Sequence, residues 1–529
     1  MMLISNILLG LCFFAFSSTV DGQTTVELDY GTFIGVEDSS TNITSFLGVR
    51  YAEPPVGDLR WQAPVFPPTT QLGTVNASAY GNSCIPVPQS TVVSGTSEDC
   101  LFVNVFTPLG ATSNSNLPIM VCLHGGGFQS GNSQVDAVPL MNASAGMIFV
   151  SIEYRLGQFG FLAGSTFAAA NVSLNAGMLD QRTALMWIQR YISSFGGDPT
   201  QVTIWGESAG AGGIMFHLIA NGGDQEGLFH AAMGDSVSLS YMPDCDSDYH
   251  SDIFALFAGF AGCSSSSDVM ACLLAADADT LVSAGTQTVD NRTSTLYIWD
   301  PCADTGGTFL ATRPVEAFAS GAFAQVPGLF GSNTDEGANW SADLPNPDAN
   351  TSEPNATETT VYNFVAGQYP TFTNDSFATA MELYPLADYN NSFSLQGQQM
   401  YGEARYICSG LMIAAAMSRV GLDAYHYHYN NPDQGSDHGS ELIALFDPTS
   451  DFSGNDAALF VSMQEFWTSF VIAQSPIAAS VSTWLPVTNS TSGGPRLLLQ
   501  PGGIAMENVT DALSARCAFW HSLGAEIST

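Results

Sequence analysis

Residues 203–213 read "TIWGESAGAGG" and place a serine between two glycines, where one kind of sequence pattern gives way to another. The preceding run 201–205 is short, apolar and β-rich, which indicates a buried strand, and residues 209–220 carry apolar side chains at helical spacing. Ser208 is therefore predicted to lie on a sharp strand-to-helix turn, with flanking glycines that let neighbouring backbone pass. Such a turn exposes one hydroxyl and predicts a nucleophile; a plain glycine-rich turn is the structural alternative.

The same alternation extends along most of the chain. Short apolar runs at 119–123, 146–154 and 326–331 have the pattern of buried strands, and residues 179–192 have that of a helix. This βα alternation predicts an α/β fold with one central, mostly parallel sheet and helices on both faces.

The ends of the chain and one polar segment bear on domain organisation. Residues 1–22 contain an apolar run of signal-peptide length, without a basic residue before it, and an uncleaved anchor is the alternative. Length alone would allow about three domains at ~150 residues each. Residues 335–360 are polar and proline-rich, but the helical patterning resumes beyond them, so we interpret them as a surface excursion. We therefore expect one domain over 23–529, in a secreted protein without a membrane span.

Composition restricts the possible partners. The formal net charge is −38, and all 11 basic residues are arginine. Such a charge repels nucleic acids and anionic membranes. The chain is also rich in N-x-S/T sequons, which favours a glycosylated exterior. The sequon asparagines are Asn42, Asn76, Asn142, Asn171, Asn291, Asn339, Asn350, Asn355, Asn374, Asn390, Asn489 and Asn508.

Ten cysteines are present, one of them in the expected signal peptide, which leaves an odd number in the mature chain. In an oxidising compartment most should pair and one should stay free. Cys122, inside a buried-strand pattern, is the best candidate for the free thiol. Cys263 and Cys272 are close enough in sequence to pair, as are Cys84 and Cys100, and the other pairings remain open.

A nucleophilic serine needs a histidine base, and that histidine needs a carboxylate. In hydrolases with this turn, the order along the chain is serine, acid, histidine. His438 lies in a loop rich in glycine and serine that follows a strand pattern, where such a base belongs. Asp335 and Glu336 both follow a buried strand, and either could be the acid by position.

The residues 122–131, "CLHGGGFQSG", follow another buried strand and supply consecutive glycines. Their N–H groups, with the N–H of Ala209 after the serine, could stabilise the negative charge that develops on an ester carbonyl oxygen.

Taken together, these motifs resemble the type-B carboxylesterase/lipase family, which has the α/β-hydrolase fold and includes cholinesterases and fungal lipases. The similar stretches cover nearly all of residues 25–525. They are "FLGVRYAEPPVGDLRW" (46–61), "SEDCLFVNVFTP" (97–108), "HGGGF" (124–128), "EYRLGQFGFLA" (153–163), "NAGMLDQRTALMWIQRYISSFGGDPTQVTIWGESAGA" (175–211), "GSNTDEG" (331–337) and "RCAFW" (516–520).

The resemblance assigns roles to individual residues. It implies Ser208 as nucleophile, Glu336 rather than Asp335 as acid, and His438 as base. Beyond this triad it implies oxyanion donors at Gly126, Gly127 and Ala209, and a substrate pocket that includes Glu207 and Phe128. It also implies an Arg60–Glu98 ion pair and the disulfides Cys84–Cys100, Cys263–Cys272 and Cys408–Cys517, which leaves Cys245–Cys302 by elimination.

Departures from the family pattern restrict the substrate. The loop 85–99 lacks the tryptophan that faces choline in cholinesterases, and Pro86 and Pro88 break its start as a helix. The loop can therefore form only a short helix, too short for the amphipathic lid of the family's lipases. We expect a site that is largely open in water.

The expected function is that of a secreted serine hydrolase of carboxylic esters, acting through an acyl-enzyme without cofactor or metal. The acidic run 244–252, "DCDSDYHSD", lacks a convincing metal-ligand spacing. A lipase or sterol esterase is the alternative within the enzyme class. A non-catalytic, esterase-like adhesion protein is the alternative outside it, and such proteins lack the serine or the histidine.

Overall fold

The computed structural model describes residues 22–529 except 145, 171, 448–451, 482 and 489–493. The expected signal peptide thus lies outside the described residues apart from its last position. Sequon asparagines Asn171 and Asn489 also lie outside them.

Fifteen strands form in the described chain, and thirteen of them join one sheet. Along that sheet the order is β1-β2-β3-β7-β9-β8-β10-β11-β12-β13-β14-β15, with β4 paired to β2 and with β5–β6 separate. The strands are β1 (Gly22–Leu28), β2 (Gly31–Asp38), β3 (Ile43–Arg50), β4 (Thr74–Asn76), β5 (Ser83–Cys84), β6 (Thr96–Ser97), β7 (Phe102–Pro108), β8 (Leu117–Leu123), β9 (Ile148–Ile152), β10 (Gly197–Glu207), β11 (Ala231–Asp235), β12 (Gly328–Asn333), β13 (Ala424–Tyr429), β14 (Pro495–Leu499) and β15 (Ala505–Asn508).

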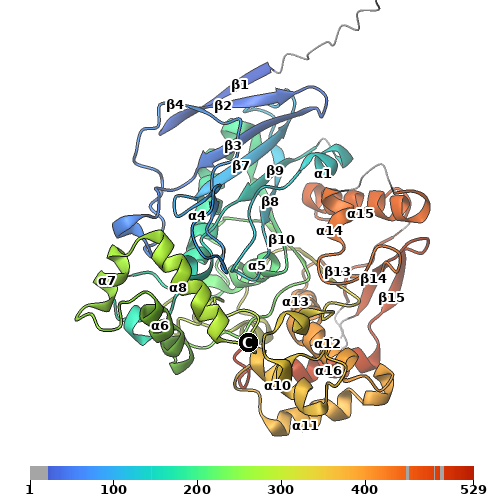
Figure 1. Ribbon diagram of the computed structural model, residues 1–529. Helices are drawn as coiled ribbons and strands as arrows, with labels where there is room; N and C mark the ends of the chain where they lie inside the picture. The colour runs from blue at the N-terminus through green and yellow to red at the C-terminus, as the bar shows by residue number, and fades with distance from the viewer. Residues whose placement is uncertain (1–21, 145, 171, 448–451, 482, 489–493) are drawn as a thin grey trace, which may run out of the picture.

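Helices flank this sheet (Figure 1). They are α1 (Val138–Ala143), α2 (Gly157–Gly160), α3 (Ser165–Ala168), α4 (Ala176–Tyr191), α5 (Ala209–Ile219), α6 (Asp248–Phe260), α7 (Val269–Ala275), α8 (Ala278–Asn291), α9 (Pro314–Ser320), α10 (Glu358–Gln368), α11 (Asn374–Leu383), α12 (Phe393–Gly402), α13 (Cys408–Arg419), α14 (Leu442–Phe446), α15 (Gly454–Ala473) and α16 (Asp511–Ser522). A π-helical turn, Glu403–Ile407, joins α12 to α13.

The centre of the sheet is parallel and its margins are antiparallel. Strands β9, β8, β10, β11, β12, β13 and β14 pair in parallel, in that order, whereas β1, β2, β3, β7 and β9 pair antiparallel, as does β15 with β14. Because parallel strands end at a common edge, the loops after β8, β10, β12 and β13 meet there. The predicted fold class, a mostly parallel sheet between helices, is confirmed.

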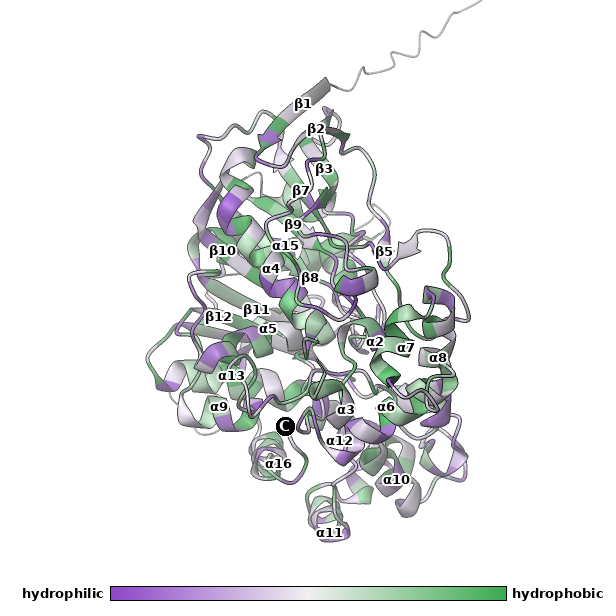
Figure 2. Ribbon diagram, turned by 90° about the vertical axis from the view of Figure 1, so that its left-hand side faces the viewer, coloured by the Kyte–Doolittle hydropathy of each residue, from purple (hydrophilic) through white to green (hydrophobic). Residues whose placement is uncertain are grey.

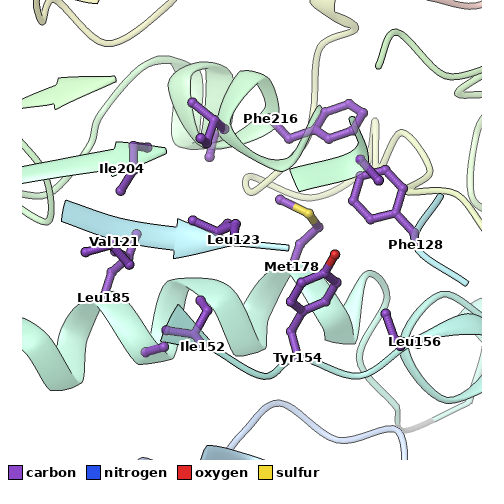
Figure 3. Packing of buried hydrophobic residues seen from close by; sticks show 14 of the residues in the cluster. Val121, Leu123, Phe128, Ile152, Tyr154, Leu156, Met178, Leu185, Ile204 and Phe216 are labelled. Carbon is purple, nitrogen blue, oxygen red and sulfur yellow. The ribbon is translucent and has the colours of Figure 1, made fainter. Parts of the chain in front are cut away.

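Alternation along the central strands fills two cores. On β8, Val121 and Leu123 pack toward α4 and α5, and Figure 3 shows them beside Ile204 of β10. Met120 and Cys122 point to the other face, toward α15. Figure 2 shows this hydrophobic character along the central strands, with more hydrophilic residues on outer helices such as α11 and α12.

Four disulfides join cysteines of the described chain: Cys84–Cys100, Cys263–Cys272, Cys408–Cys517 and Cys245–Cys302. They are the three pairs that the resemblance implies and the pair left by elimination. Cys122 is free and buried, and burial raises the pKa of its thiol to about 12. A neutral thiol in this position is unreactive.

Two further expectations concern the surface. Arg60 and Glu98 form the expected ion pair, with an Nε–Oε1 distance of 2.6 Å. Among the described sequon asparagines, Asn350 is buried, which is incompatible with a glycan in the folded chain, and the others are exposed. The exposed ones are Asn42, Asn76, Asn142, Asn291, Asn339, Asn355, Asn374, Asn390 and Asn508.

No single helix of the described chain has the length and hydropathy needed to cross a membrane. The segments Val269–Ala275 and Ala278–Asn291 reach that hydropathy only together, and they are bent by 118° at the break between them.

Candidate active site

Ser208 occupies the predicted turn between β10 and α5. Its φ of 57° and ψ of −122° are unusual for a residue with a side chain, which is typical of strain stored at a functional site. A Cβ on Gly206 would lie 2.6 Å from the carbonyl oxygen of Leu123, and one on Gly210 would collide with the same oxygen. Both glycines are therefore required by the close approach of β8 to the turn.

His438 lies between the serine and a carboxylate. Its Nε2 is 2.8 Å from the Oγ of Ser208, and its Nδ1 is 2.6 Å from Oε2 of Glu336. The other oxygen of Glu336 accepts hydrogen bonds from the Ser236 hydroxyl at 2.6 Å and the Asn333 N–H at 2.7 Å. The carboxylate is completely buried and is fixed at both oxygens. A hydroxyl, an imidazole and a held carboxylate in this order can generate a nucleophile.

Asp335, the other candidate acid, lies elsewhere. Its side chain is exposed and borders a hollow of about 290 Å³ that Glu336 and Asp388 also line. Within hydrogen-bond distance of His438 lies Glu336, at 2.6 Å. The turn after β12 therefore directs only Glu336 toward His438. Ser236, which follows β11, and Asn333 were not foreseen from the sequence. Their signal was their position at the carboxyl ends of the neighbouring parallel strands β11 and β12.

The glycine loop after β8 lies directly against the serine. A Cβ on Gly125 would come within 3.1 Å of the Cβ of Ser208. Gly126 and Gly127 have positive φ angles, 105° and 62°, and a Cβ on either would collide with Ser130 or Tyr297 respectively. Ala209 is the first residue of α5, where backbone N–H groups have no partner within the helix. These elements can together present N–H groups to an oxyanion.

Glu207 also approaches the histidine. Its Oε1 lies 3.1 Å from Nε2 of His438, and burial raises the pKa of Glu207 to about 7. Burial by itself would lower the pKa of His438, but the carboxylates of Glu207 and Glu336 outweigh it and raise that pKa overall. Burial likewise raises the pKa of Glu441, and that of Asp235 to about 7 although Trp205 and Trp467 donate to it.

Aromatic rings narrow the approach to the site. Tyr406, on the π-helical turn, and Trp340 lie against His438, with ring centroids 4.1 and 5.3 Å from the imidazole. Tyr297 covers Gly127. Trp340 and Tyr297 also line a cleft of about 350 Å³. The rings beside His438 therefore come from segments distant from the serine in sequence.

Two sequence expectations change here. Ser208 is only 7% exposed, so the site is narrower than the expected open one, although the loop after Cys84 is short and non-helical. The narrowing comes from Trp340, Tyr406 and Tyr297. Phe128 was expected in the substrate pocket, but its fully buried ring packs in the core, with its centroid 5.2 Å from that of Phe161. Its φ of 56° places the side chain on the core side of the loop.

Among the residues that the structure describes, no group of three or more His, Cys, Asp or Glu side chains is arranged to hold a metal ion.

The buried titratable groups predict how stability depends on pH. Glu207 and Asp235 keep their protons to about pH 7 when folded, whereas unfolded carboxyl groups lose them near pH 4, so stability falls as pH rises across that range. Buried histidines act oppositely: burial lowers their pKa, so stability is lost as pH falls below about 6.5. These are His124, His217, His250, His426 and His521.

We expect the melting temperature to peak near about pH 6.5 and to be a few degrees lower at about pH 4.5 and 8, as scanning calorimetry would measure. Repulsion within a chain of net charge −38 adds to the fall on the alkaline side. Asp235→Asn keeps an acceptor for the two tryptophans. It should reduce the decrease in melting temperature between about pH 6.5 and 8. A melting temperature that rises steadily through all three pH values would contradict this balance.

Known proteins are similar over most of this chain. The model of the "Carboxylesterase family" matches residues 22–520. Pyrethroid hydrolase Ces2e of Rattus norvegicus is 29% identical over 86% of this chain and 82% of its own length. Secreted triacylglycerol lipase LIP1 of Gibberella zeae is 30% identical over 80% of this chain and 78% of its own.

A solved structure has a similar fold. The crystal structure of Aspergillus niger EstA superposes with a TM-score of 0.85 and 32% identity, over 96% of this chain and 99% of that one. With a family match across nearly its full length and this shared fold, the chain belongs to the carboxylesterase family and is a carboxylic ester hydrolase.

Proposed function

We propose that this chain is a secreted serine esterase that works through a Ser208–His438–Glu336 triad and an acyl-enzyme. The observation that carries the proposal is the position of His438, which contacts Ser208 with one nitrogen, at 2.8 Å, and Glu336 with the other, at 2.6 Å. The catalytic unit is a single domain over residues 23–529, produced after removal of residues 1–22. Four disulfides, exposed sequons and a secreted relative support the extracellular location.

The reaction follows from the geometry. His438 takes the proton of the Ser208 hydroxyl through Nε2 while the oxygen attacks the ester carbonyl carbon. Glu336 accepts from Nδ1–H, which fixes the tautomer and stabilises the imidazolium. The N–H groups of Gly126, Gly127 and Ala209 stabilise the oxyanion, and losing one such donor typically costs about 2.7–4 kcal/mol.

Proton transfer completes the cycle. The imidazolium of His438 gives its proton to the departing alcohol. The acyl group then remains bound to the oxygen of Ser208. A water molecule, deprotonated by the same histidine, then attacks that acyl group and releases the acid. Glu207, at 3.1 Å from Nε2, stabilises the charged histidine when it is itself ionised.

The test of the acyl-enzyme is a pre-steady-state burst combined with active-site labelling. Rapid mixing with p-nitrophenyl acetate should release about one nitrophenol per chain before the steady state. A fluorophosphonate should abolish turnover with one label per chain, and peptide mass mapping should place it on Ser208. Stoichiometric labelling of another serine would refute the assignment.

A lipase acting on long-chain esters is the second candidate, because the relative from Gibberella zeae is a triacylglycerol lipase. The structure favours the esterase: Cys84 and Cys100 enclose a loop that, though described throughout, contains no helix and only a short β-pairing. Such a loop has no amphipathic face to expose at an oil surface.

We therefore expect no interfacial activation. The rate on a soluble short-chain ester such as tributyrin should rise smoothly with concentration through the solubility limit. The measurement is a pH-stat titration on both sides of that limit, with an enzyme of known interfacial activation as positive control. A several-fold jump when droplets form would favour the lipase and would point to another lid, such as the segment that carries Trp340.

A further inference from the structure

The arginines of this chain fall into two groups. Nine of the 11 form ion pairs with aspartate or glutamate: Arg50, Arg60, Arg155, Arg182, Arg190, Arg313, Arg405, Arg496 and Arg516. Arg292 and Arg419 form no ion pair with any residue that the structure describes. In a chain with 49 acidic residues, a cation without a carboxylate partner is unusual.

Arg292 borders the cleft beside the active site. Asp290 and Asp343 line the same cleft and oppose its charge there. Its surroundings are therefore net negative, and it belongs to the site already described.

Arg419 has different surroundings. It lies at one end of a groove of about 360 Å³ between α9, α13 and α16, and none of the lining residues is acidic. The groove is mainly apolar, with Val315 and Ala319 from α9, Leu411 and Ala415 from α13, and Ala518 from α16. Figure 2 shows α9 and α13 next to each other, with α16 close by, at one end of the molecule.

Arg419 has spare hydrogen-bonding capacity. The only hydrogen bond of its guanidinium within the described chain runs from Nη2 to the carbonyl oxygen of Phe318, at 3.1 Å, and a guanidinium has five N–H donors. His521, the other titratable residue of the groove, contacts the Cys408 carbonyl through Nε2 at 3.1 Å. Burial lowers the pKa of His521 to about 4, so at neutral pH Arg419 is the only charged side chain among the described residues that line the groove.

Helix α13 separates this groove from the catalytic site. Its inner face packs on β12 and β13, and Gly410 there approaches His426. Leu411, Ala415 and Arg419 lie on the groove side at helical spacing. They extend over eight residues, or about 12 Å. A ligand in the groove would therefore lie outside the substrate cleft.

We propose that this groove binds one long-chain fatty acid, with its carboxylate on Arg419 and its alkyl chain along α13. Charge complementarity selects the anion, since an arginine fork matches a carboxylate. The apolar wall of the groove would contact the alkyl chain of the ligand. The groove volume lies within the usual range for small-molecule sites. The site is distinct from the triad and does not depend on the proposed catalytic mechanism.

The test is calorimetric titration of dodecanoate, below its micellar concentration, into the full-length enzyme with its active site blocked by a fluorophosphonate. Dodecan-1-ol has the same chain without the charge and serves as the ligand control. We expect one dodecanoate per chain, bound at least about tenfold more tightly than the alcohol. Arg419→Gln should lower the affinity for dodecanoate about tenfold and leave the affinity for the alcohol unchanged.

Two further variants make the result specific. Ala518→Phe, at an exposed position, should fill the groove and weaken the binding of both dodecanoate and dodecan-1-ol. Arg190→Gln removes an equal charge from a half-exposed surface ion pair and should change neither. Melting temperatures verify that each variant folds.

Three results would overturn the proposal. The first is no dodecanoate binding to the blocked enzyme. The second is binding that Arg419→Gln and Arg190→Gln affect equally. The third is a dimer in sedimentation that Ala518→Phe dissociates, because the groove's occupant would then be a second copy of the chain.

Discussion

Ser208→Ala is expected to lower kcat for a soluble short-chain ester by roughly five to six orders of magnitude, with secretion and folding intact. The substitution removes the one oxygen that can form the acyl-enzyme, so His438 and Glu336 have no nucleophile to activate. Any residual rate should come from the oxyanion donors and from water. The measurement is steady-state kinetics on p-nitrophenyl butyrate, with fluorophosphonate labelling of the same preparation.

Folding should not explain that loss. Ser208 is on a strained turn, but alanine adds no atoms there and removes one hydroxyl. Ser332→Ala is a matched control: this serine is buried on strand β12, which β11 separates from β10, and its Oγ has no hydrogen-bond partner in the described chain. It should retain activity within about twofold. Turnover by Ser208→Ala above about a thousandth of the wild-type rate, with contaminating esterase excluded, would contradict a serine mechanism.

Sequence reasoning succeeded where the chemistry is local. The turn at Ser208 is specified by a strand pattern, two glycines and a helix pattern within about ten residues, so it can be read directly. The glycine loop before Gly127 is local in the same sense. Helical and strand periodicity also predict the parallel sheet, because each element needs only its own buried face.

Sequence reasoning failed where contacts join distant segments. Trp340 and Tyr406 narrow the approach to Ser208 from more than a hundred residues away, and nothing in a single sequence shows that approach. The prediction that Phe128 lies in the substrate pocket was wrong for another reason. Its neighbours in the motif form the site, but its left-handed backbone places the ring in the core.

The choice between Asp335 and Glu336 is of the same long-range kind. Both residues follow β12, and only the path of the turn and the donors Ser236 and Asn333 distinguish them. Resemblance to a family pointed to Glu336, whereas residue spacing left both open. A pair of isosteric substitutions therefore tests the acid directly.

Glu336→Gln is expected to lower kcat/KM by about three to four orders of magnitude, and Asp335→Asn by no more than a few-fold. In the native site one oxygen of Glu336 accepts from Ser236 and Asn333, and the other accepts from His438. An amide has only one oxygen. If it faces the two donors, its NH₂ group faces Nδ1 of His438 and favours the tautomer that cannot accept the serine proton.

The pH profile separates this catalytic effect from simple damage to the fold. Catalysis requires neutral His438, so activity should rise with pH through a pKa above the usual 6.5. Glu336→Gln removes one of the two carboxylates that raise this pKa, so the rising limb of the residual activity should move to lower pH. Asp335→Asn should leave it near the wild-type position. Equal losses in both variants, or an unmoved limb in Glu336→Gln, would mean that Glu336 does not hold His438.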